Sequence, residues 1–242
     1  TVDSNLSDLQ NFVIKNKCDV GIAFDGDADR IVVTDEKGRI IRSDILIALF
    51  LPYVIKEGDS VVYDVKCSKA LEDMILSCKG NPVMWKTGHS LIKDKMKNEN
   101  AKLGGEMSGH IFFSDDYFGY DDAVYVGLRL LEILSKFDRP MSSYLENIPI
   151  YYSTPEIRLN CVNDNEKINI MNEAFDYFSN KFEYSDIDGI RLKLENGWAL
   201  IRCSNTQPVI VCRVEASSDK KLDSYKSMVI DKLISLGVSY DE

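Results

Sequence analysis

Three aspartates alternate with small residues in one short segment, Asp25-Gly26-Asp27-Ala28-Asp29-Arg30. Like charges this close raise one another's pKa unless a cation lies among them. Mg²⁺ and Ca²⁺ prefer oxygen ligands, and small spacers let the backbone turn so that the carboxylates converge. The guanidinium of Arg30 is suited to a phosphate oxygen beside the metal. This segment, the aspartate loop, therefore predicts a site for a divalent metal and a phosphate.

Two alternatives for the aspartate loop involve no phosphate. One is an acidic surface turn, in which Asp-Gly pairs are common. The other is a structural Ca²⁺ loop, because the three aspartates and Glu36 nearly fit the EF-hand spacing. The position where that loop needs Gly is Arg30, and the flanking apolar runs are typical of strands rather than helices. The EF-hand therefore fails on context, and a plain turn or another Ca²⁺ loop stays open.

A glycine-rich loop at residues 104–110 offers a carboxylate at Glu106, a hydroxyl at Ser108 and an imidazole at His110. Glycine permits close backbone approach, and the three side chains can donate hydrogen bonds to hydroxyl groups or accept from them. The loop is suited to recognition of sugar hydroxyls, and an ordinary polar turn explains it equally well.

A polar loop at residues 202–208 lies between two strand-like runs near the C-terminus. It combines the charge of Arg202 with the side chains of Ser204, Asn205 and Thr206. Hydroxyls, an amide and successive backbone N–H groups bind anions, and no Asp or Glu within the loop would repel them. We expect this C-terminal polar loop to bind phosphate, with a simple loop as the alternative.

Lys66 and His89 each follow an expected strand and precede an expected helix. Functional residues of open α/β sheets gather at the carboxyl ends of strands. Each residue alone is weak evidence, since His89 could simply cap its turn. Their shared position predicts two residues of one cleft.

The regions around these motifs predict an α/β architecture. A helical stripe at residues 6–17 and strands at 20–24 and 31–34 surround the aspartate loop. Helices and strands then alternate, with Ser43 expected as the first N-cap: helix 44–53, strand 60–65, helix 69–78, strand 83–86, helix 91–99, strand 111–113 and helix 122–136. Such alternation predicts a mixed sheet with helices on both faces.

The last part of the chain predicts a small α+β domain, because strands in hairpins lie beside a few helices. The expected elements are strand 156–159, helix 166–180, strands 190–194, 198–202 and 209–216, and helix 222–236. We therefore expect three parts: residues 1–39, the tail of an α/β domain that holds the aspartate loop, residues 40–149, a further α/β domain, and residues 150–242, the α+β domain.

Composition excludes several classes of protein. A net charge of −10 over 242 residues argues against nucleic-acid binding, and the longest apolar stretch is too short to span a membrane. Six cysteines without a CxxC pair are typical of reduced thiols in a cytoplasmic protein. Only two histidines are present, which argues against a zinc site.

In combination and order, the motifs resemble those of the α-D-phosphohexomutase superfamily, most closely its phosphomannomutase/phosphoglucomutase branch. The resemblance rests on residues 25–30, Lys66 with His89, residues 106–110 and residues 202–206. That family has three related α/β domains and a C-terminal α+β domain. The resemblance implies that the chain holds the end of the second domain, the third and the fourth.

The resemblance also implies roles. Asp25, Asp27 and Asp29 would bind Mg²⁺, and Arg30 would lie beside the reactive phosphate. Lys66 and His89 would contact substrate or transfer protons. The remaining residues would bind the sugar and its other phosphate: Glu106, Ser108, His110, Arg202, Ser204, Asn205 and Thr206.

The implied enzyme is an isomerase that interconverts hexose 6-phosphate and hexose 1-phosphate through a phosphoserine, with glucose or mannose 1,6-bisphosphate as intermediate and activator. The family's phosphoserine lies in a Ser-His-Asn motif of the first domain, and this sequence contains no Ser-His pair. We therefore expect an inactive C-terminal fragment whose partners are the hexose phosphate and the N-terminal domains of its parent chain.

Two alternatives to this function stay open. The first is a phosphoglucosamine mutase, although such enzymes usually carry Gln in the sugar loop and Gly-Thr in the phosphate loop. This chain has Met107 and Ser-Asn-Thr at those places. The second is a non-catalytic fragment that binds sugar phosphate and Mg²⁺.

Overall fold

The aspartate loop is the turn of an antiparallel hairpin in the computed structural model, which describes residues 3–136, 138–204 and 206–240. The hairpin strands are β1 (Val20–Phe24) and β2 (Ile31–Asp35), and β3 (Ile40–Ile41) extends the sheet beyond β2. Helix α1 (Ser7–Asn16), which follows the short η1 (Asp3–Leu6), packs on one face. It comes so close that a Cβ at Gly21 would lie 2.6 Å from Val13 Cγ2.

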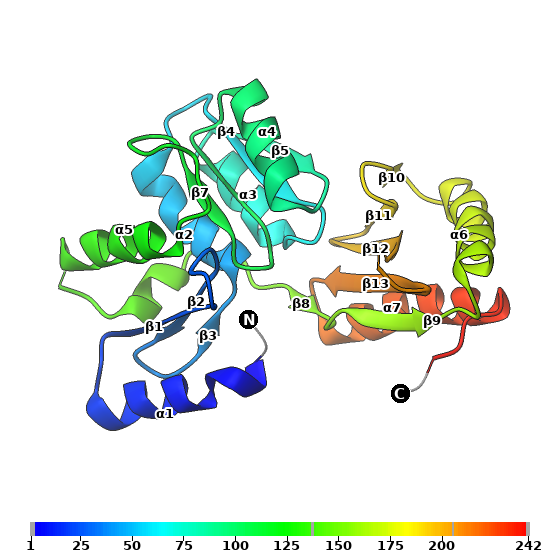
Figure 1. Ribbon diagram of the computed structural model, residues 1–242, viewed down its shortest axis with the longest axis horizontal. Coiled ribbons are helices and arrows are strands. Elements are labelled where there is room, and N and C mark those ends of the chain that lie inside the picture. Colours follow the sequence, from blue (N-terminus) through cyan, green and yellow to red (C-terminus); the bar gives the residue numbers. More distant parts are fainter. Residues whose placement is uncertain (1–2, 137, 205, 241–242) are drawn as a thin grey trace. The chain divides into compact units, whose positions relative to one another are not determined.

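A four-stranded mixed sheet with the order β5-β4-β6-β7 carries the next motifs (Figure 1). Strand β4 (Ser60–Asp64) is parallel to β5 (Asn81–Trp85) and β6 (Leu103–Gly105), and β7 (Ile111–Phe113) is antiparallel to β6. The helices of this region are α2 (Ser43–Val54), α3 (Lys69–Ser77), α4 (His89–Glu99), α5 (Ala123–Ser135) and the short η2 (Met141–Leu145).

Helices cover both faces of the mixed sheet, which confirms the predicted fold class. Val62 and Phe112 pack with Ile92 and Met96 of α4 on one face. On the other face α2 packs against β6, where a Cβ at Gly105 would lie 2.6 Å from an Ile47 methyl. The glycines of β6 therefore let helices approach closely from both sides, because a Cβ at its neighbour Gly104 would lie 2.5 Å from the α4 sulfur.

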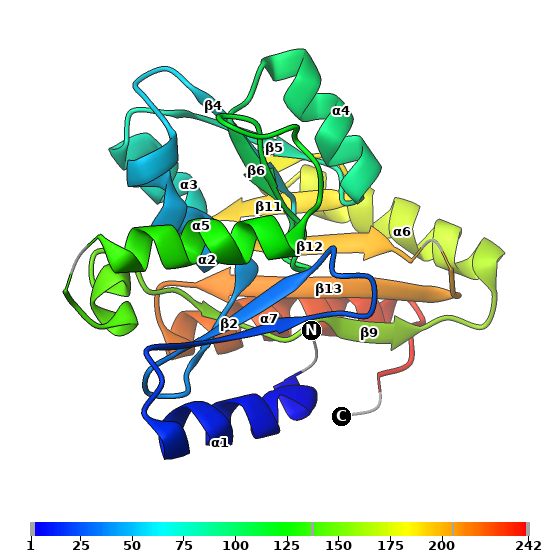
Figure 2. The same cartoon turned by 60° about the vertical axis from the view of Figure 1, so that its left-hand side comes forward.

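Residues Ile150–Glu242 form a separate unit from Thr1–Pro149, with an antiparallel six-stranded sheet and two helices. Strands β10, β11, β12 and β13 form a meander, and the far edge of β13 pairs with both β8 and β9. Figure 2 shows β11, β12, β13 and β9 in this order. The elements are β8 (Tyr152–Ser153), β9 (Ile157–Asn160), α6 (Asp164–Ser179), β10 (Tyr184–Ser185), β11 (Ile190–Leu194), β12 (Gly197–Cys203), β13 (Val209–Ala216) and α7 (Asp219–Ser235).

One hydrophobic core joins that sheet to both helices. Alternate sheet residues such as Leu192, Ile201 and Cys212 pack with Ala174 of α6 and Leu233 of α7. The alternation places one face of β9, β11, β12 and β13 in this core, as expected for an α+β domain, so that prediction is confirmed.

The structure corrects some local predictions. Ser43 is not an N-cap but the first residue of α2, and its hydroxyl donates to the Glu106 carbonyl at 2.6 Å. Gly104 and Gly105 belong to strand β6, so the loop begins only at Glu106. The short strands β3, β6, β8 and β10 were not predicted. Among the described helices, none is long and apolar enough to cross a bilayer.

Candidate functional site

The aspartate loop brings its three carboxylates together. The Ala28 N–H donates to the Asp25 carbonyl at 3.2 Å, and the Arg30 N–H donates to Asp25 Oδ1 at 3.1 Å. Ala28 adopts φ 58°, a left-handed conformation that is uncommon outside glycine and that closes the tight turn. Oxygens of Asp25, Asp27 and Asp29 consequently lie within 4.8 Å of one another, close enough to share one cation.

Arg30 already places positive charge against this group. Its Nε lies 3.5 Å from Asp25 Oδ2 and 3.8 Å from Asp29 Oδ1. Slight burial favours the neutral acid at Asp25, but the hydrogen bond from the Arg30 N–H and the Arg30 charge outweigh it and lower the pKa of this carboxyl. The carboxylate of Asp25 is therefore stabilised in part by the neighbouring arginine, without a metal.

The loop between β6 and β7 lies directly beside the aspartate loop. The Ile31 N–H donates to the Gly109 carbonyl at 3.1 Å, which links the two loops through backbone. His110 Nε2 lies 3.2 Å from Asp29 Oδ2 and 3.2 Å from Arg30 Nε. Residues 80 positions apart in sequence thus form one polar group.

Glu106 is buried and orients His110. Its Oε2 lies 2.8 Å from His110 Nδ1, and its Oε1 accepts a 2.6 Å hydrogen bond from the Gly88 N–H. Burial alone would raise the pKa of Glu106, but these two hydrogen bonds lower it below its usual value. The Ser108 hydroxyl lies 3.2 Å from the same His110 nitrogen.

His110 gains affinity for a proton from these neighbours. Burial disfavours the charged imidazole, but the bond to Glu106 and the charges of Glu106 and Asp29 outweigh it and raise the pKa of His110. The cause is that each ring nitrogen of His110 faces a carboxylate, Nδ1 that of Glu106 and Nε2 that of Asp29.

His89 begins helix α4 and stacks on His110, with ring centroids 5.3 Å apart and an interplanar angle of 23°. His89 Nδ1 lies 2.6 Å from Asp121 Oδ2, and Lys93 Nζ donates to Asp121 Oδ1 at 2.9 Å. Burial opposes ionisation of Asp121, but these hydrogen bonds lower its pKa to about 2. From the sequence, no role was expected for Asp121 or Lys93. The only local feature that could have indicated Asp121 is the acidic pair at residues 121–122.

Lys66 follows β4 in a turn built around buried Asp64. The Asp64 carboxylate accepts from the Lys66 N–H at 3.2 Å and from the Met107 N–H at 3.4 Å. Burial raises the pKa of Asp64, and the Lys66 charge only partly opposes this. The Lys66 charge also contributes to the lowered pKa of Glu106, so Lys66 belongs electrostatically to the same group.

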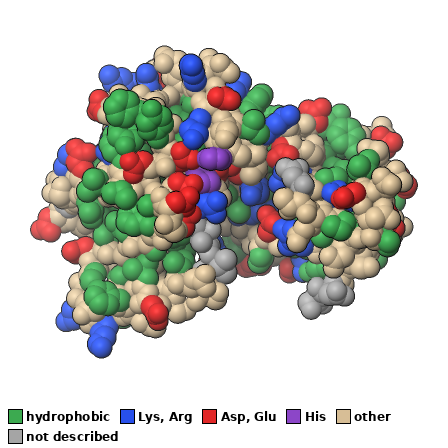
Figure 3. Space-filling model, viewed as in Figure 1, with side chains coloured by type: hydrophobic (Ala, Val, Ile, Leu, Met, Phe, Trp, Pro, Cys, Tyr) green, Lys and Arg blue, Asp and Glu red, His purple; other side chains and the backbone are tan. Residues whose placement is uncertain are grey.

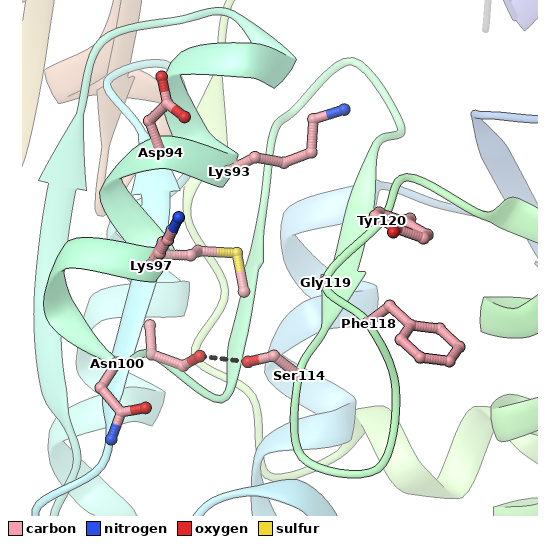
Figure 4. Close-up of a pocket in the computed structure, with 10 residues that line it drawn as sticks. Lys93, Asp94, Lys97, Asn100, Ser114, Phe118, Gly119 and Tyr120 are labelled. Atoms are coloured by element: carbon pink, nitrogen blue, oxygen red, sulfur yellow. Dashed lines mark hydrogen bonds between the residues drawn. The ribbon is translucent and has the colours of Figure 1, made fainter.

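Side chains of opposite charge meet on the visible surface of the first unit. Figure 3 shows the histidines beside Asp or Glu side chains, with Lys or Arg side chains next to them. A pocket of about 380 Å³ lies near Lys93, between α4 and residues 114–120 (Figure 4). Its lining includes Lys97 and Tyr120, and the Ser114 hydroxyl donates to the Ala101 carbonyl there.

The C-terminal polar loop contains an ion pair that its sequence did not reveal. Arg202 Nη2 lies 3.2 Å from Asp188 Oδ1, so an acidic residue from another segment partly neutralises this cation. The Thr206 N–H donates to the Ser204 hydroxyl at 3.3 Å. Asn205 lies outside the described residues.

Lys167 of α6 supports the C-terminal polar loop from a buried position. Its Nζ donates to the Ser204 carbonyl at 2.9 Å and the Gln207 carbonyl at 3.1 Å. It also forms a 2.7 Å ion pair with Asp164. These contacts fix the two ends of the loop, and sequence reasoning assigned this lysine no role.

Comparison with protein-family models assigns three successive parts of the chain. All three models describe phosphoglucomutase/phosphomannomutase: alpha/beta/alpha domain II at residues 1–38, alpha/beta/alpha domain III at residues 42–152, and the C-terminal domain at residues 156–232.

Individual relatives agree with these matches. The phosphomannomutase/phosphoglucomutase of Pseudomonas aeruginosa is 42% identical over 231 residues, which cover 95% of this chain and 50% of that protein. The phosphoglucomutase of Neisseria gonorrhoeae is 40% identical over 223 residues, or 90% of this chain and 48% of that protein. The chain spans about half the length of these relatives.

A solved structure extends the similarity to three dimensions. The crystal structure of a phosphoglucomutase/phosphomannomutase family protein from Burkholderia thailandensis matches with a TM-score of 0.89 and 37% identity. The match covers 98% of this chain and 51% of that chain.

Proposed function

The chain belongs to the phosphoglucomutase/phosphomannomutase family, and we propose that it supplies the metal, sugar and second-phosphate sites of a hexose-phosphate mutase. The proposed reaction interconverts hexose 6-phosphate and hexose 1-phosphate. The observation that carries it is the meeting of the aspartate loop with His110, where Asp29 and His110 lie 3.2 Å apart. We propose the domain division 1–39, 40–149 and 150–242 for these tasks.

The aspartate loop is proposed to hold Mg²⁺ through Asp25, Asp27 and Asp29. Three converging carboxylates fit a hard cation, and the strands β1 and β2 around them are unlike the helices of an EF-hand. When bound, Mg²⁺ supplies positive charge that stabilises the phosphoryl group during transfer. Arg30 is proposed to swing from the carboxylates to a phosphate oxygen, since 43% of its side chain is exposed.

The first unit's other polar residues are proposed to position the sugar and move protons. Lys66 and His89 contact the substrate or exchange protons with its hydroxyl. Ser108 binds a sugar hydroxyl. Glu106 is proposed to bind the sugar too, and its hydrogen bonds to Gly88 and His110 would fix its orientation. His110 acts in the same loop.

The C-terminal polar loop is proposed to hold the phosphate that is not transferred. Arg202 supplies the charge, while Ser204, Asn205 and Thr206 supply hydroxyl, amide and backbone donors. Lys167 ties down both ends of the loop, which reduces the entropy lost on binding.

The phosphoserine is proposed to come from outside these 242 residues, since they contain no Ser-His pair. A 1,6-bisphosphate of glucose or mannose would form when that serine transfers its phosphoryl group, and would return its other phosphate to the serine. The chain alone is then a sugar-phosphate and metal binder without turnover. We also propose that it acts in the cytoplasm.

Two measurements test the proposed function. Calorimetry should detect binding of glucose 1-phosphate, and Arg202→Ala should weaken it about tenfold or more, as expected for a charged hydrogen bond. Lys193→Ala, which removes one charge from an exposed pair, is the matched control and should bind normally. A coupled assay with glucose 1,6-bisphosphate should show no sustained turnover. Equal affinities of all three proteins would refute the phosphate site, and turnover would refute the external serine.

A further inference from the structure

The fold brings both histidines of the chain together with two aspartates. Donor atoms of Asp29, His89, His110 and Asp121 all lie within 4.8 Å of one another, and we call these four residues the His–Asp cluster. They come from the aspartate loop, the start of α4, the end of the loop before β7 and the segment before α5. The number of histidines argued against a zinc site in the sequence, but their placement does not.

One separation in the His–Asp cluster matches that between two ligands of a tetrahedral ion, and a second is shorter. Zn²⁺ binds His nitrogen and Asp oxygen at about 2.0–2.2 Å, so neighbouring ligands lie roughly 3.3–3.6 Å apart. His110 Nε2 and Asp29 Oδ2 are 3.2 Å apart, close to that separation. His89 Nδ1 and Asp121 Oδ2 are 2.6 Å apart, and the His89 ring is stacked on His110. Both would bind one ion only after His89 turns out of the stack, which its half-exposed ring permits.

The groups behind the cluster are those that orient metal ligands. A ligating histidine usually directs its second nitrogen to a carboxylate, and His110 Nδ1 lies 2.8 Å from buried Glu106. Lys93 holds Asp121 Oδ1 at 2.9 Å and leaves Oδ2 toward His89. Two of the four ligands are therefore held by outer contacts before any ion binds.

We propose that the His–Asp cluster is a second metal site, which takes Zn²⁺ and competes with a cation in the aspartate loop. Imidazole nitrogen favours Zn²⁺ over Mg²⁺, whereas the all-carboxylate aspartate loop favours the harder ion. Competition follows because Asp29 belongs to both groups. Arg30 leaves His110 when Zn²⁺ enters, since its exposed side chain can turn into solvent.

The second site does not depend on the mutase function. It requires only the four side chains of the cluster and their outer contacts. In a mutase, however, Zn²⁺ at this place would occupy His89 and His110 and remove Asp29 from the aspartate loop. The ion would then act as an inhibitor.

The test is calorimetric titration of the whole chain with Zn²⁺, alone and in excess Mg²⁺. One Zn²⁺ should bind to each chain. Excess Mg²⁺ should weaken the affinity for Zn²⁺ in proportion to the fraction of aspartate loops that hold Mg²⁺. His89→Gln should weaken Zn²⁺ about tenfold or more and leave Mg²⁺ binding unchanged. Asp27→Asn should keep Zn²⁺ binding and lose the Mg²⁺ competition, and Asp29→Asn should impair both.

Co²⁺ absorption provides an independent readout. Bound Co²⁺ should show intense visible bands of a tetrahedral nitrogen and oxygen site, and Asp121→Asn should remove them. Wild-type Zn²⁺ affinity in His89→Gln, or a thiolate charge-transfer band from one of the six cysteines, would overturn the proposal. If Mg²⁺ fails to bind while one Zn²⁺ binds and His89→Gln weakens it, the proposed mutase metal and the competition fail, and the Zn²⁺ site itself stands.

Discussion

Replacing Lys167 with Met should destabilise the C-terminal polar loop and the domain that carries it. The lysine is 7% exposed, and its Nζ donates to the Ser204 and Gln207 carbonyls. Methionine keeps the apolar stem but supplies no donor, so both carbonyls lose a charged partner.

The magnitude follows from these contacts. A hydrogen bond to a charged group contributes about 1.5–3 kcal/mol, and two are lost. Removing a buried ammonium also removes its desolvation cost, which offsets part of that loss. The ion pair to Asp164 adds little, because that aspartate is 73% exposed. We expect Lys167→Met to lower the free energy of unfolding by about 2–4 kcal/mol.

The assay is urea unfolding followed by tryptophan fluorescence. The chain has two tryptophans, so a Trp85→Phe background leaves Trp198 in β12 as the reporter of the second unit. Lys193→Met in the same background is the control, because the Lys193–Glu183 pair is almost fully exposed and should contribute below about 1 kcal/mol.

A binding measurement separates loop order from global stability. At low temperature, where both variants stay folded, Lys167→Met should bind glucose 1-phosphate more weakly than Lys193→Met. If the two variants unfold at the same urea concentration and bind alike, Lys167 does not support the loop and the reasoning is refuted.

Three further predictions concern other parts of the fold. In EDTA, which keeps metal ions away, Asp121→Asn should lower the free energy of unfolding by roughly 2 kcal/mol at neutral pH. The reason is that the pKa of Asp121 is about 2 in the folded protein and 3.8 ordinarily. The difference should vanish in unfolding titrations as pH falls from about 4 to 2. Gly105→Ala should lower the free energy of unfolding by about 1–3 kcal/mol, seen as a lower thermal midpoint, since its Cβ would lie 2.7 Å from a backbone carbonyl. Gly26→Ala should leave the free energy of unfolding unchanged, because a Cβ at Gly26 would have no atom within 4 Å. Burial raises the pKa of Cys212, so thiol reagents should label the partly exposed Cys18 first; rapid native labelling of Cys212 would contradict this.

The sequence predicted elements well where one periodicity ran through a segment. Strands β1, β7, β11 and β13, and the seven α-helices found in the described residues, were expected within a few residues of their observed bounds. The missed strands are two or three residues long, and β6 is Leu-Gly-Gly, which has no strand propensity of its own. These short strands form because they pair with neighbouring strands, so the local sequence pattern does not predict them.

Ser43 shows the same limit for a side chain. It stands where an N-cap is expected, but its hydroxyl bonds to a carbonyl 63 residues away. A tertiary partner thus replaced the local one. No pattern within a few residues could have indicated this choice.

The candidate site divides along similar lines. The aspartate loop could be predicted because its ligands are neighbours in the chain and need only a tight turn. Asp188, Lys167 and Asp121 could not, because each acts on a group contributed by a distant segment. The C-terminal polar loop itself contains no acidic residue, as its sequence shows. In the folded structure, however, Asp188 from another segment lies beside Arg202.

Glu106 explains how three of the motifs depend on one another. Its backbone carbonyl accepts from Ser43 at the start of α2, and one carboxylate oxygen accepts from Gly88 at the start of α4. The other oxygen holds His110, which stacks on His89 and contacts Asp29.

A displacement of the Glu106 side chain would therefore be transmitted to the first turn of α4 and to the aspartate loop together. The geometry favours Glu106 as the residue that sets the distance between His89 and the carboxylates. Hydrogen bonds thus hold Glu106 and His110 in place, whereas the half-exposed His89 and Arg30 side chains can still move. If the site binds an ion or a sugar phosphate as proposed, this partial preorganisation lowers the cost of binding.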